Sequence, residues 1–321
     1  MKDSLIIIDN MLLADLDVIV KIAECRSITA AATLLDMRVA TASAALKRVE
    51  KSLGAELFVR TTRRLRLSAA GERYLPQCQL ALETLAQARQ NMQQELDIIE
   101  GELRLALPSD LGRNIISPWL DELLATHPKL SLRTNLSDSH IDFYRDAVDV
   151  ALRYGSPKDS SLYGFKICTV PGVLCASPDY LSRCGTPTQP QDLLSHNGLF
   201  YQLYDMTHDV WQFSHDGRSQ KIKMSGNRAS NDGDQVRRWC IDGQGVAIKS
   251  CLDMSTDLLN KKVVNVMPDY RPKASELWLI CPSRQSITPA VRLLRDTLQQ
   301  HCAALLKALA SEGILSQEQI R

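Results

Sequence analysis

Three short apolar stripes follow one another between residues 16 and 53, and they constrain the fold more than any other feature of the sequence. Their apolar residues are spaced three and four apart, as on one face of a helix: Leu16, Ile19, Val20 and Ala23; Ala31, Leu34 and Leu35; Ala42, Leu46, Val49 and Leu53. The first helix is expected to end near residues 25–26. Ser27 or Thr29 can cap the second helix, and Gly54 can close the third in a left-handed conformation. The pattern predicts three small helices packed on one another.

Positive charge is concentrated around and after the third helix. Residues 38–73 hold nine Lys or Arg against three Glu, whereas the whole chain has a net charge of only +1. Arg64 and Arg66 alternate there with Leu65 and Leu67, which predicts a short strand with one cationic face. A basic head of three helices followed by a β-wing is typical of proteins that bind nucleic acids.

The segment from about Thr29 to Lys51 has the size of a helix-turn-helix, whose second helix enters the major groove of DNA. The alternative is an ordinary helical hairpin with a solvated charged face, and the basic wing argues against it. The helices are predicted to contact DNA through Thr29, Arg38, Thr41, Ser43, Lys47 and Arg48. The wing is predicted to contact mainly phosphates, through Arg60, Thr62, Arg63, Arg64 and Arg66.

A longer apolar stripe follows the wing. From Leu75 to Ile99 the apolar residues keep a spacing of three and four that is broken only at Arg89, which predicts a long helix with a coiled-coil seam that runs to about Glu100. Pro76 lacks a backbone N–H, so we expect either a kink or a later helix start there. An uncovered seam would leave apolar side chains in water, so we expect a partner helix in a homodimer, or else the C-terminal part of the same chain, to cover it.

After Gly101, short apolar strands alternate with helical stretches, which predicts an α/β architecture with mostly parallel sheets. Residues 103–107, 115–123 and 130–136 predict a βαβ unit. Further strands are expected at residues 148–152, 173–176, 199–201, 245–248, 263–266 and 277–281. This number of strands suits two small lobes, and the end of the chain, residues 310–321, has no predicted function.

Several classes of protein are disfavoured. The sequence has no Gly-rich phosphate loop and no HExxH or GxSxG motif, which argues against an enzyme. Its six His residues are scattered; His208 and His215 lie near Trp211, but no acidic or thiol cluster accompanies them, so we expect neither a metal site nor another cofactor. Nine Cys without a CxxC pair argue against a disulfide framework, and no apolar run reaches the roughly 20 residues of a membrane span. We therefore expect a cytoplasmic protein.

The N-terminal motifs resemble those of the LysR-type transcriptional regulators. Residues 28–32 (ITAAA), 46–54 (LKRVEKSLG) and 57–71 (LFVRTTRRLRLSAAG) match that family in type, order and spacing, and the resemblance continues over nearly the whole chain. Residues 110–113 (DLGR) and 225–233 (SGNRASNDG) are similar to one branch of the family. The chain departs from the family at the start of the recognition helix and at Ala44. Base readout is therefore expected to depend more on Arg38, Thr41 and Ser43, with DNA shape supplying the rest.

The resemblance implies an α/β protein with an N-terminal all-α winged helix-turn-helix, a long linker helix and a two-lobed effector domain like that of periplasmic binding proteins. We assign residues 1–71 to DNA binding, 72–100 to the linker and dimerisation helix, 101–309 to the effector domain and 310–321 to a C-terminal tail. Within the effector domain, lobe 1 is expected at about 101–168 and 268–309, and lobe 2 at about 169–267. The resemblance also implies dimers that pair into tetramers, and such a regulator is expected to contact RNA polymerase and no membrane.

Open α/β sheets bind ligands beyond the carboxyl ends of their strands, where helix N-termini attract anionic groups. Two such termini are expected at Ser109–Asp110 and at Asn231–Asp232, and each has the alternative interpretation of a plain N-cap. The resemblance implies that strand ends add Ser137, Arg153, Tyr201 and Lys249 to a cleft between the lobes. Arg153 favours an anionic effector, because its guanidinium can bind a carboxylate through two hydrogen bonds; the alternative is a salt bridge to Asp149 or Asp110.

The sequence therefore predicts a DNA-binding transcriptional regulator that is controlled by a small molecule. Paired basic heads would bind operator DNA, and an effector between the lobes would change the spacing of these heads. One alternative is an architectural DNA-binding protein whose α/β domain only oligomerises. Another is a solute-binding protein or enzyme built on the same two-lobed fold, against which the basic N-terminal unit argues.

Overall fold

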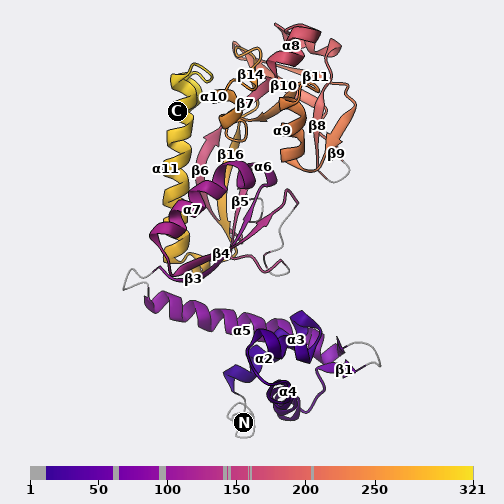
Figure 1. The fold of residues 1–321 in the computed structure, drawn as a ribbon, viewed down its shortest axis with the longest axis vertical. Helices are drawn as coiled ribbons and strands as arrows, with labels where there is room; N and C mark the ends of the chain where they lie inside the picture. Colours follow the sequence, from indigo (N-terminus) through magenta and orange to yellow (C-terminus); the bar gives the residue numbers. More distant parts are fainter. Residues whose placement is uncertain are drawn as a thin grey trace. The chain divides into compact units, whose positions relative to one another are not determined.

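The computed structural model describes residues 12–60, 65–93, 99–139, 143, 146–157, 159, 161–203 and 206–320. The chain forms two compact units, Met1–Leu96 and Asp97–Arg321. The first unit consists of helices and a two-stranded wing, whereas strands and helices alternate in the second (Figure 1).

The first unit contains the three predicted helices, α2 (Leu13–Cys25), α3 (Ile28–Leu34) and α4 (Val39–Leu53). Their apolar stripes form one core, in which Ile19, Ile22 and Val49 are completely buried. Of the two possible caps of α3, the structure shows Ser27, whose hydroxyl accepts a hydrogen bond from the Ala30 N–H at 3.2 Å. Gly54 ends α4 at φ 63°, the left-handed conformation that was predicted.

The wing consists of β1 (Phe58–Arg60) and β2 (Leu65–Leu67), which pair antiparallel. Helix α5 (Ala69–Gln93) follows it. The later start that Pro76 suggested is wrong: α5 begins seven residues earlier, so the missing N–H of Pro76 interrupts the helical hydrogen bonds without ending the helix. The predicted end of this helix, at about Glu100, falls next to residues 94–98, which lie outside the described residues. Ile99 and Glu100 are not helical, and β3 begins at Gly101, where φ is 100°.

The second unit begins with the predicted βαβ arrangement. Strands β3 and β4 are parallel, and the helical stretch between them contains a π-helical turn, η2. The first sheet has the order β4-β3-β5-β16-β6. Its strands are β3 (Gly101–Leu107), β4 (Leu130–Leu136), β5 (Val150–Tyr154), β6 (Tyr163–Val170) and β16 (Ser275–Cys281). Its helical segments are α6 (Ser109–Leu111), η2 (Gly112–Ile116), α7 (Ser117–Thr126), η4 (Arg284–Ser286) and α11 (Pro289–Ser311).

Three smaller sheets make up the rest of the second unit, with the orders β11-β10-β15, β12-β8-β9 and β13-β7-β14. We call the five-stranded sheet with α6, α7 and α11 lobe 1, and the three smaller sheets with α8 and α9 lobe 2. The strands are β7 (Gly172–Ala176), β8 (Leu199–Leu203), β9 (Met206–Thr207), β10 (Val210–His215), β11 (Arg218–Lys223), β12 (Arg228–Ser230), β13 (Ala247–Ser250), β14 (Val264–Asn265) and β15 (Arg271–Pro272). The helices are α8 (Pro178–Cys184), η3 (Pro190–Ser195), α9 (Gly233–Ile241) and α10 (Ser255–Leu259).

The chain crosses between the lobes twice, after β6 and after β15, and this connectivity corrects the prediction of mostly parallel sheets. Because β16 re-enters lobe 1 from lobe 2, it runs antiparallel to both β5 and β6. Strands β10 and β11 are antiparallel because the tight turn at Asp216 and Gly217, both with positive φ, joins them as a hairpin. The sheets are therefore mixed.

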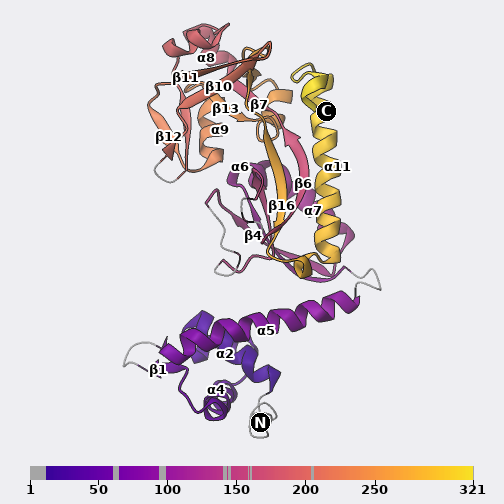
Figure 2. The same cartoon turned by 180° about the vertical axis from the view of Figure 1, so that it is seen from behind.

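Helix α11 lies along β6 in both views (Figures 1 and 2). Val291, Leu294 and Leu298 on its inner face are completely buried in the core that it shares with the sheet. The chain then continues to η5 (Gln317–Ile320), with Leu315 buried in the same core and the Ile314 carbonyl accepting a hydrogen bond from the Asn265 side chain at 3.0 Å. The C-terminal residues therefore pack against the second unit.

Candidate functional site

The outer face of α4 carries the predicted base-reading residues. Ala42, Ala45, Leu46 and Val49 point into the core, which turns Thr41 and Lys47 to the surface. Arg38 at the N-cap and Thr29 on α3 are also exposed, whereas Ser43 is half-buried. Among the described residues Lys47 has no hydrogen-bond or ion-pair partner, so its charge is available to a ligand.

Arg48 is arranged differently from its neighbour Lys47. Its Nε and Nη2 atoms donate to the two carboxylate oxygens of Asp15, at 2.9 and 2.6 Å, and Asp15 is buried on α2. This ion pair raises the pKa of Arg48, chiefly through the hydrogen bond to Asp15. The guanidinium therefore joins α4 to α2, and the two N–H groups that could bind a phosphate together are already bound to Asp15.

The wing is attached to the end of α4 by Glu50. One carboxylate oxygen of Glu50 accepts the N–H groups of Leu57 and Phe58, at 2.8 and 3.3 Å. This contact fixes the start of β1. On the second strand of the wing, β2, the predicted phosphate contact Arg66 is exposed. The other predicted phosphate contacts, namely the Arg60 side chain, Thr62, Arg63 and Arg64, lie outside the described residues.

A cavity of about 390 Å³ lies between the two lobes of the second unit. Four predicted effector residues line it: Asp110, Arg153, Tyr201 and Lys249. Asn231 lines a neighbouring hollow of about 360 Å³ together with Asp138, which lines both spaces. Ser109, Ser137 and Asp232 line neither of them. The predicted residues are thus only partly brought together.

Lys249 is the centre of a buried charge cluster on the cavity wall. Its ammonium group donates to the Asp110 carboxylate and, at 2.9 Å, to the Gly233 carbonyl, and it lies 3.5 Å from Asp253. Burial by itself would lower the pKa of Lys249, but Asp110 and Asp253 outweigh it and raise that pKa. Burial raises the pKa of Asp253 to about 6, although Lys249 acts in the opposite direction. The charge of Lys249 is therefore neutralised within the protein.

Arg153, on β5, is a buried cation of the cavity wall whose charge is not neutralised in this way; Lys273 also lines the cavity, but its side chain is exposed. Both alternatives for a salt bridge are occupied elsewhere: Asp149 binds Arg104 at 2.7 Å, and Asp110 binds Lys249. The Nη2 atom of Arg153 is buried and has no hydrogen-bond partner among the described residues, and Nη1 reaches only the Leu152 carbonyl, at 3.5 Å. Burial lowers the pKa of Arg153, while Asp138 acts to raise it.

Three of the predicted polar residues have structural contacts. The Asp232 carboxylate caps α9 by accepting the Asp234 N–H at 2.9 Å, so the plain N-cap interpretation holds for it. The Ser137 hydroxyl accepts the Ser139 N–H at 3.1 Å. Ser109 is bonded to Asp138, which lies one position beyond Ser137 and was not among the predicted residues. An acidic residue two positions after a predicted strand was the available signal.

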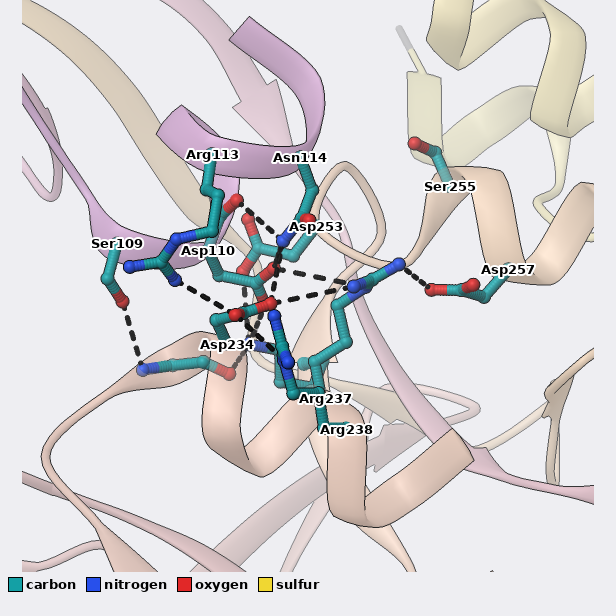
Figure 3. A network of polar contacts seen from close by, with 12 residues as sticks. Ser109, Asp110, Arg113, Asn114, Asp234, Arg237, Arg238, Asp253, Ser255 and Asp257 are labelled. Carbon is teal, nitrogen blue, oxygen red and sulfur yellow. Dashed lines mark hydrogen bonds and ion pairs between the residues drawn. The ribbon is translucent and has the colours of Figure 1, made fainter. Parts of the chain in front are cut away.

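A network of ion pairs and hydrogen bonds joins the lobes at α9 (Figure 3). From lobe 1, Arg113 and Asn114 donate to the Asp234 carboxylate on α9, at 2.9 and 2.7 Å. Arg237, also on α9, reaches the buried Asp257 at 2.6 Å. Asp234 is therefore held by donors from both lobes.

The structure also bears on metal and membrane binding. Within the described ranges, no group of three or more His, Cys, Asp or Glu side chains is arranged to hold a metal ion. His208 stacks on Tyr201 and His215 packs against Tyr270. No helix in the described part of the chain has the length and apolar character that crossing a bilayer requires.

Comparison with known proteins assigns each of the two units to a protein family. Residues 13–72 match the family described as bacterial regulatory helix-turn-helix protein, lysR family. Residues 97–303 match the LysR substrate binding domain. The relatives found with these matches are transcriptional regulators and not enzymes.

Two relatives and two solved structures illustrate the match. The transcriptional regulator DmlR of Escherichia coli (strain K12) is 31% identical over 91% of this chain and 95% of its own length. The transcriptional activator TtdR of the same strain is 29% identical over 83% and 86%. The virulence activator AphB of Vibrio cholerae superposes with a TM-score of 0.55 at 27% identity, covering 91% of this chain and 99% of its own. For CrgA from Neisseria meningitidis the TM-score is 0.58 at 25% identity, covering 90% and 98%. The chain belongs to the LysR family of DNA-binding transcriptional regulators, whose C-terminal domain binds a small-molecule effector.

Proposed function

We propose that this regulator responds to an anionic effector, whose carboxylate binds Arg153 in the cavity between the lobes. The observation that supports this is the buried Nη2 atom of Arg153, which has no hydrogen-bond partner. A buried donor without a partner costs about 1–3 kcal/mol, so native proteins rarely keep one unless a ligand or water satisfies it. A carboxylate would supply both the acceptor and the opposite charge.

The surroundings of Arg153 fit such a ligand. Tyr201 faces it across the cavity from lobe 2, and burial raises the pKa of Tyr201 to about 12, so its hydroxyl keeps its proton and can donate. Val170, Leu203 and Ile248 supply apolar surface for the body of the effector. A ligand held by Arg153 and Tyr201 would contact both lobes, which is the requirement for coupling its binding to lobe movement.

Thermal unfolding in the presence of a library of small carboxylates tests this proposal. All four Trp residues, at 119, 211, 239 and 278, lie in the second unit, so tryptophan fluorescence of the intact protein reports on that unit. A bound ligand at about 100 times its dissociation constant adds about 2.7 kcal/mol of stability. We expect at least one carboxylate to raise the melting temperature of the wild-type protein and to have no such effect on Arg153→Gln.

Arg104→Gln is the matched control, because Arg104 is an arginine of lobe 1 that pairs with Asp149 and does not line the cavity. It should keep the ligand response of the wild-type protein. A carboxylate that stabilises Arg153→Gln as strongly as the wild-type protein would contradict the proposal, and so would a library without any stabilising carboxylate.

We further propose that residues 1–71 bind operator DNA and that residues 72–100 link two chains into a homodimer, which can pair into a tetramer. Leu75 and Cys78 on α5 are buried in the core of the first unit, so the first part of the predicted seam is covered within the chain itself. Leu85, further along the predicted seam, is 50% exposed. It is the described seam residue of α5 that a partner helix would cover.

Operator binding also suggests where the protein acts. A transcriptional regulator works where the chromosome is, so we place this one in the cytoplasm. TtdR is named as a transcriptional activator, and activation requires contact with RNA polymerase. We therefore propose RNA polymerase as a further partner.

A further inference from the structure

The Asp138 carboxylate occupies the junction of the two lobes next to the cavity. Its Oδ1 atom accepts the Ser109 N–H at 2.7 Å. Its Oδ2 atom accepts the Ser109 hydroxyl at 2.6 Å and the Gly233 N–H at 2.9 Å. Ser109 belongs to lobe 1 and Gly233 opens α9 in lobe 2, so this one side chain binds donors from both lobes.

These donors form the type of site that would otherwise bind a carboxylate ligand. Two backbone N–H groups and one hydroxyl converge on the same two oxygens, and both N–H groups lie at the starts of helical segments, where negative charge is favoured. Because Asp138 is part of the chain, its carboxylate is present at a high effective concentration.

We propose that Asp138 is a specificity-determining residue of the effector cleft: its carboxylate fills the anion position between the lobes and excludes an effector carboxylate from it. This inference rests on the proposed function, because it concerns which donors remain for the effector. The carboxylate of the effector then binds Arg153, while Ser109 and Gly233 are already satisfied. Asp138 also links the lobes when the effector is absent.

Chemical rescue tests the proposal. Asp138→Ala removes three heavy atoms, the carboxyl carbon and its two oxygens, and formate has these same three heavy atoms. The variant should unfold at a temperature about 5 °C lower, because the buried Ser109 N–H loses its acceptor and the lobes lose a shared partner. The Ser109 hydroxyl and the Gly233 N–H keep their second acceptors, Asp232 at 2.9 Å and the Ser109 hydroxyl oxygen at 3.2 Å. We expect about 100 mM sodium formate to recover about half of this loss, relative to the same concentration of sodium chloride. Tryptophan fluorescence of the full-length protein is the readout.

Asp138→Asn is the control for the shape of the site. Its side chain fills the same space, so formate cannot enter, and formate should stabilise neither this variant nor the wild-type protein beyond the effect of chloride. The double variant Asp138→Ala/Arg153→Gln locates the formate: rescue persists if formate binds at Ser109 and Gly233. If Asp138→Ala cannot be isolated in plain buffer, it can be purified in formate, and the formate is then removed by dialysis. Unfolding of the variant when formate is removed supports the proposal.

Three outcomes would overturn the proposal: no formate dependence of Asp138→Ala, equal stabilisation of Asp138→Asn, or loss of the rescue in the double variant. None of these results depends on the effector. The carboxylate library is tested with Asp138 intact, so a failure of the role of Arg153 and a failure of the role of Asp138 can be told apart.

Discussion

At the scale of single residues, neighbouring cations on α4 have different roles. Lys47 is exposed and unpaired among the described residues, whereas the fork of Arg48 is bound to the buried Asp15. From the sequence, both residues were predicted to contact DNA, because both lie on the face of the helix opposite its apolar stripe. The partner of Arg48 lies 33 residues earlier on another helix, and no local pattern reveals it.

Replacing these two cations separately should give opposite results. Arg48→Ala leaves the Asp15 carboxylate buried without its partner, so the first unit should melt at a lower temperature. Lys47→Ala should leave the melting temperature unchanged and weaken operator binding by about tenfold, the loss of one good contact. Circular dichroism, compared with tryptophan fluorescence, measures the stability of the first unit, and fluorescence anisotropy with labelled operator DNA measures the affinity. A stable Arg48→Ala protein with weakened binding would assign Arg48 to the DNA contact instead.

At the scale of elements, the wing is held where α5 begins. Ser68 donates its N–H to the Leu57 carbonyl at 2.9 Å, and its hydroxyl accepts the Gly71 N–H at 3.0 Å. A Cβ atom on Gly71 would lie 2.2 Å from the Leu57 oxygen, which is closer than any real contact. The glycine is therefore required by this close packing of helix against wing.

Gly71→Ala should destabilise the first unit by about 3 kcal/mol, because the Leu57 backbone has to move away from the new methyl group. Operator affinity should fall with it, since the wing moves with Leu57. Gly54→Ala is the matched control: its φ is 63° but no atom lies within 4 Å, so it should cost only about 1 kcal/mol. Chemical unfolding followed by circular dichroism compares the two variants, and equal losses would show that the contact with Leu57 is not the cause.

At the scale of the whole molecule, the two compact units divide the work between DNA and effector. The first unit carries the exposed cations of α4 and the wing, and the second carries the cavity that Arg153 lines. An operator with two-fold symmetry requires two first units, which makes the oligomer part of the function. The described part of α5 offers the exposed seam residue Leu85 for that association.

Leu85→Asp should shift the protein from dimer towards monomer, because a carboxylate would be buried against the partner helix. Size-exclusion chromatography with light scattering measures the mass, and operator affinity should fall with the loss of the dimer. Leu194→Asp is the control, since Leu194 is 61% exposed on the second unit. If Leu85→Asp keeps the mass of the wild-type protein, the proposed dimer contact is incorrect.

Local patterns in the sequence were sufficient for helices α2, α3 and α4, the left-handed Gly54, four of the five strands of lobe 1 and the family, whereas β6 was not predicted and the choice of Ser27 over Thr29 as a cap came from the structure. Apolar periodicity and capping depend on residues within about one or two helical turns, so a linear sequence displays them. Only the tertiary structure showed that Arg48 binds Asp15, that Lys249 is neutralised by Asp110, 139 positions earlier, and that Asp138 rather than Ser137 meets Ser109. It also decided the antiparallel course of β16. The physical reason is the same in each case: ion pairs and strand pairings join groups that the folded chain brings together, and their spacing along the chain follows no period.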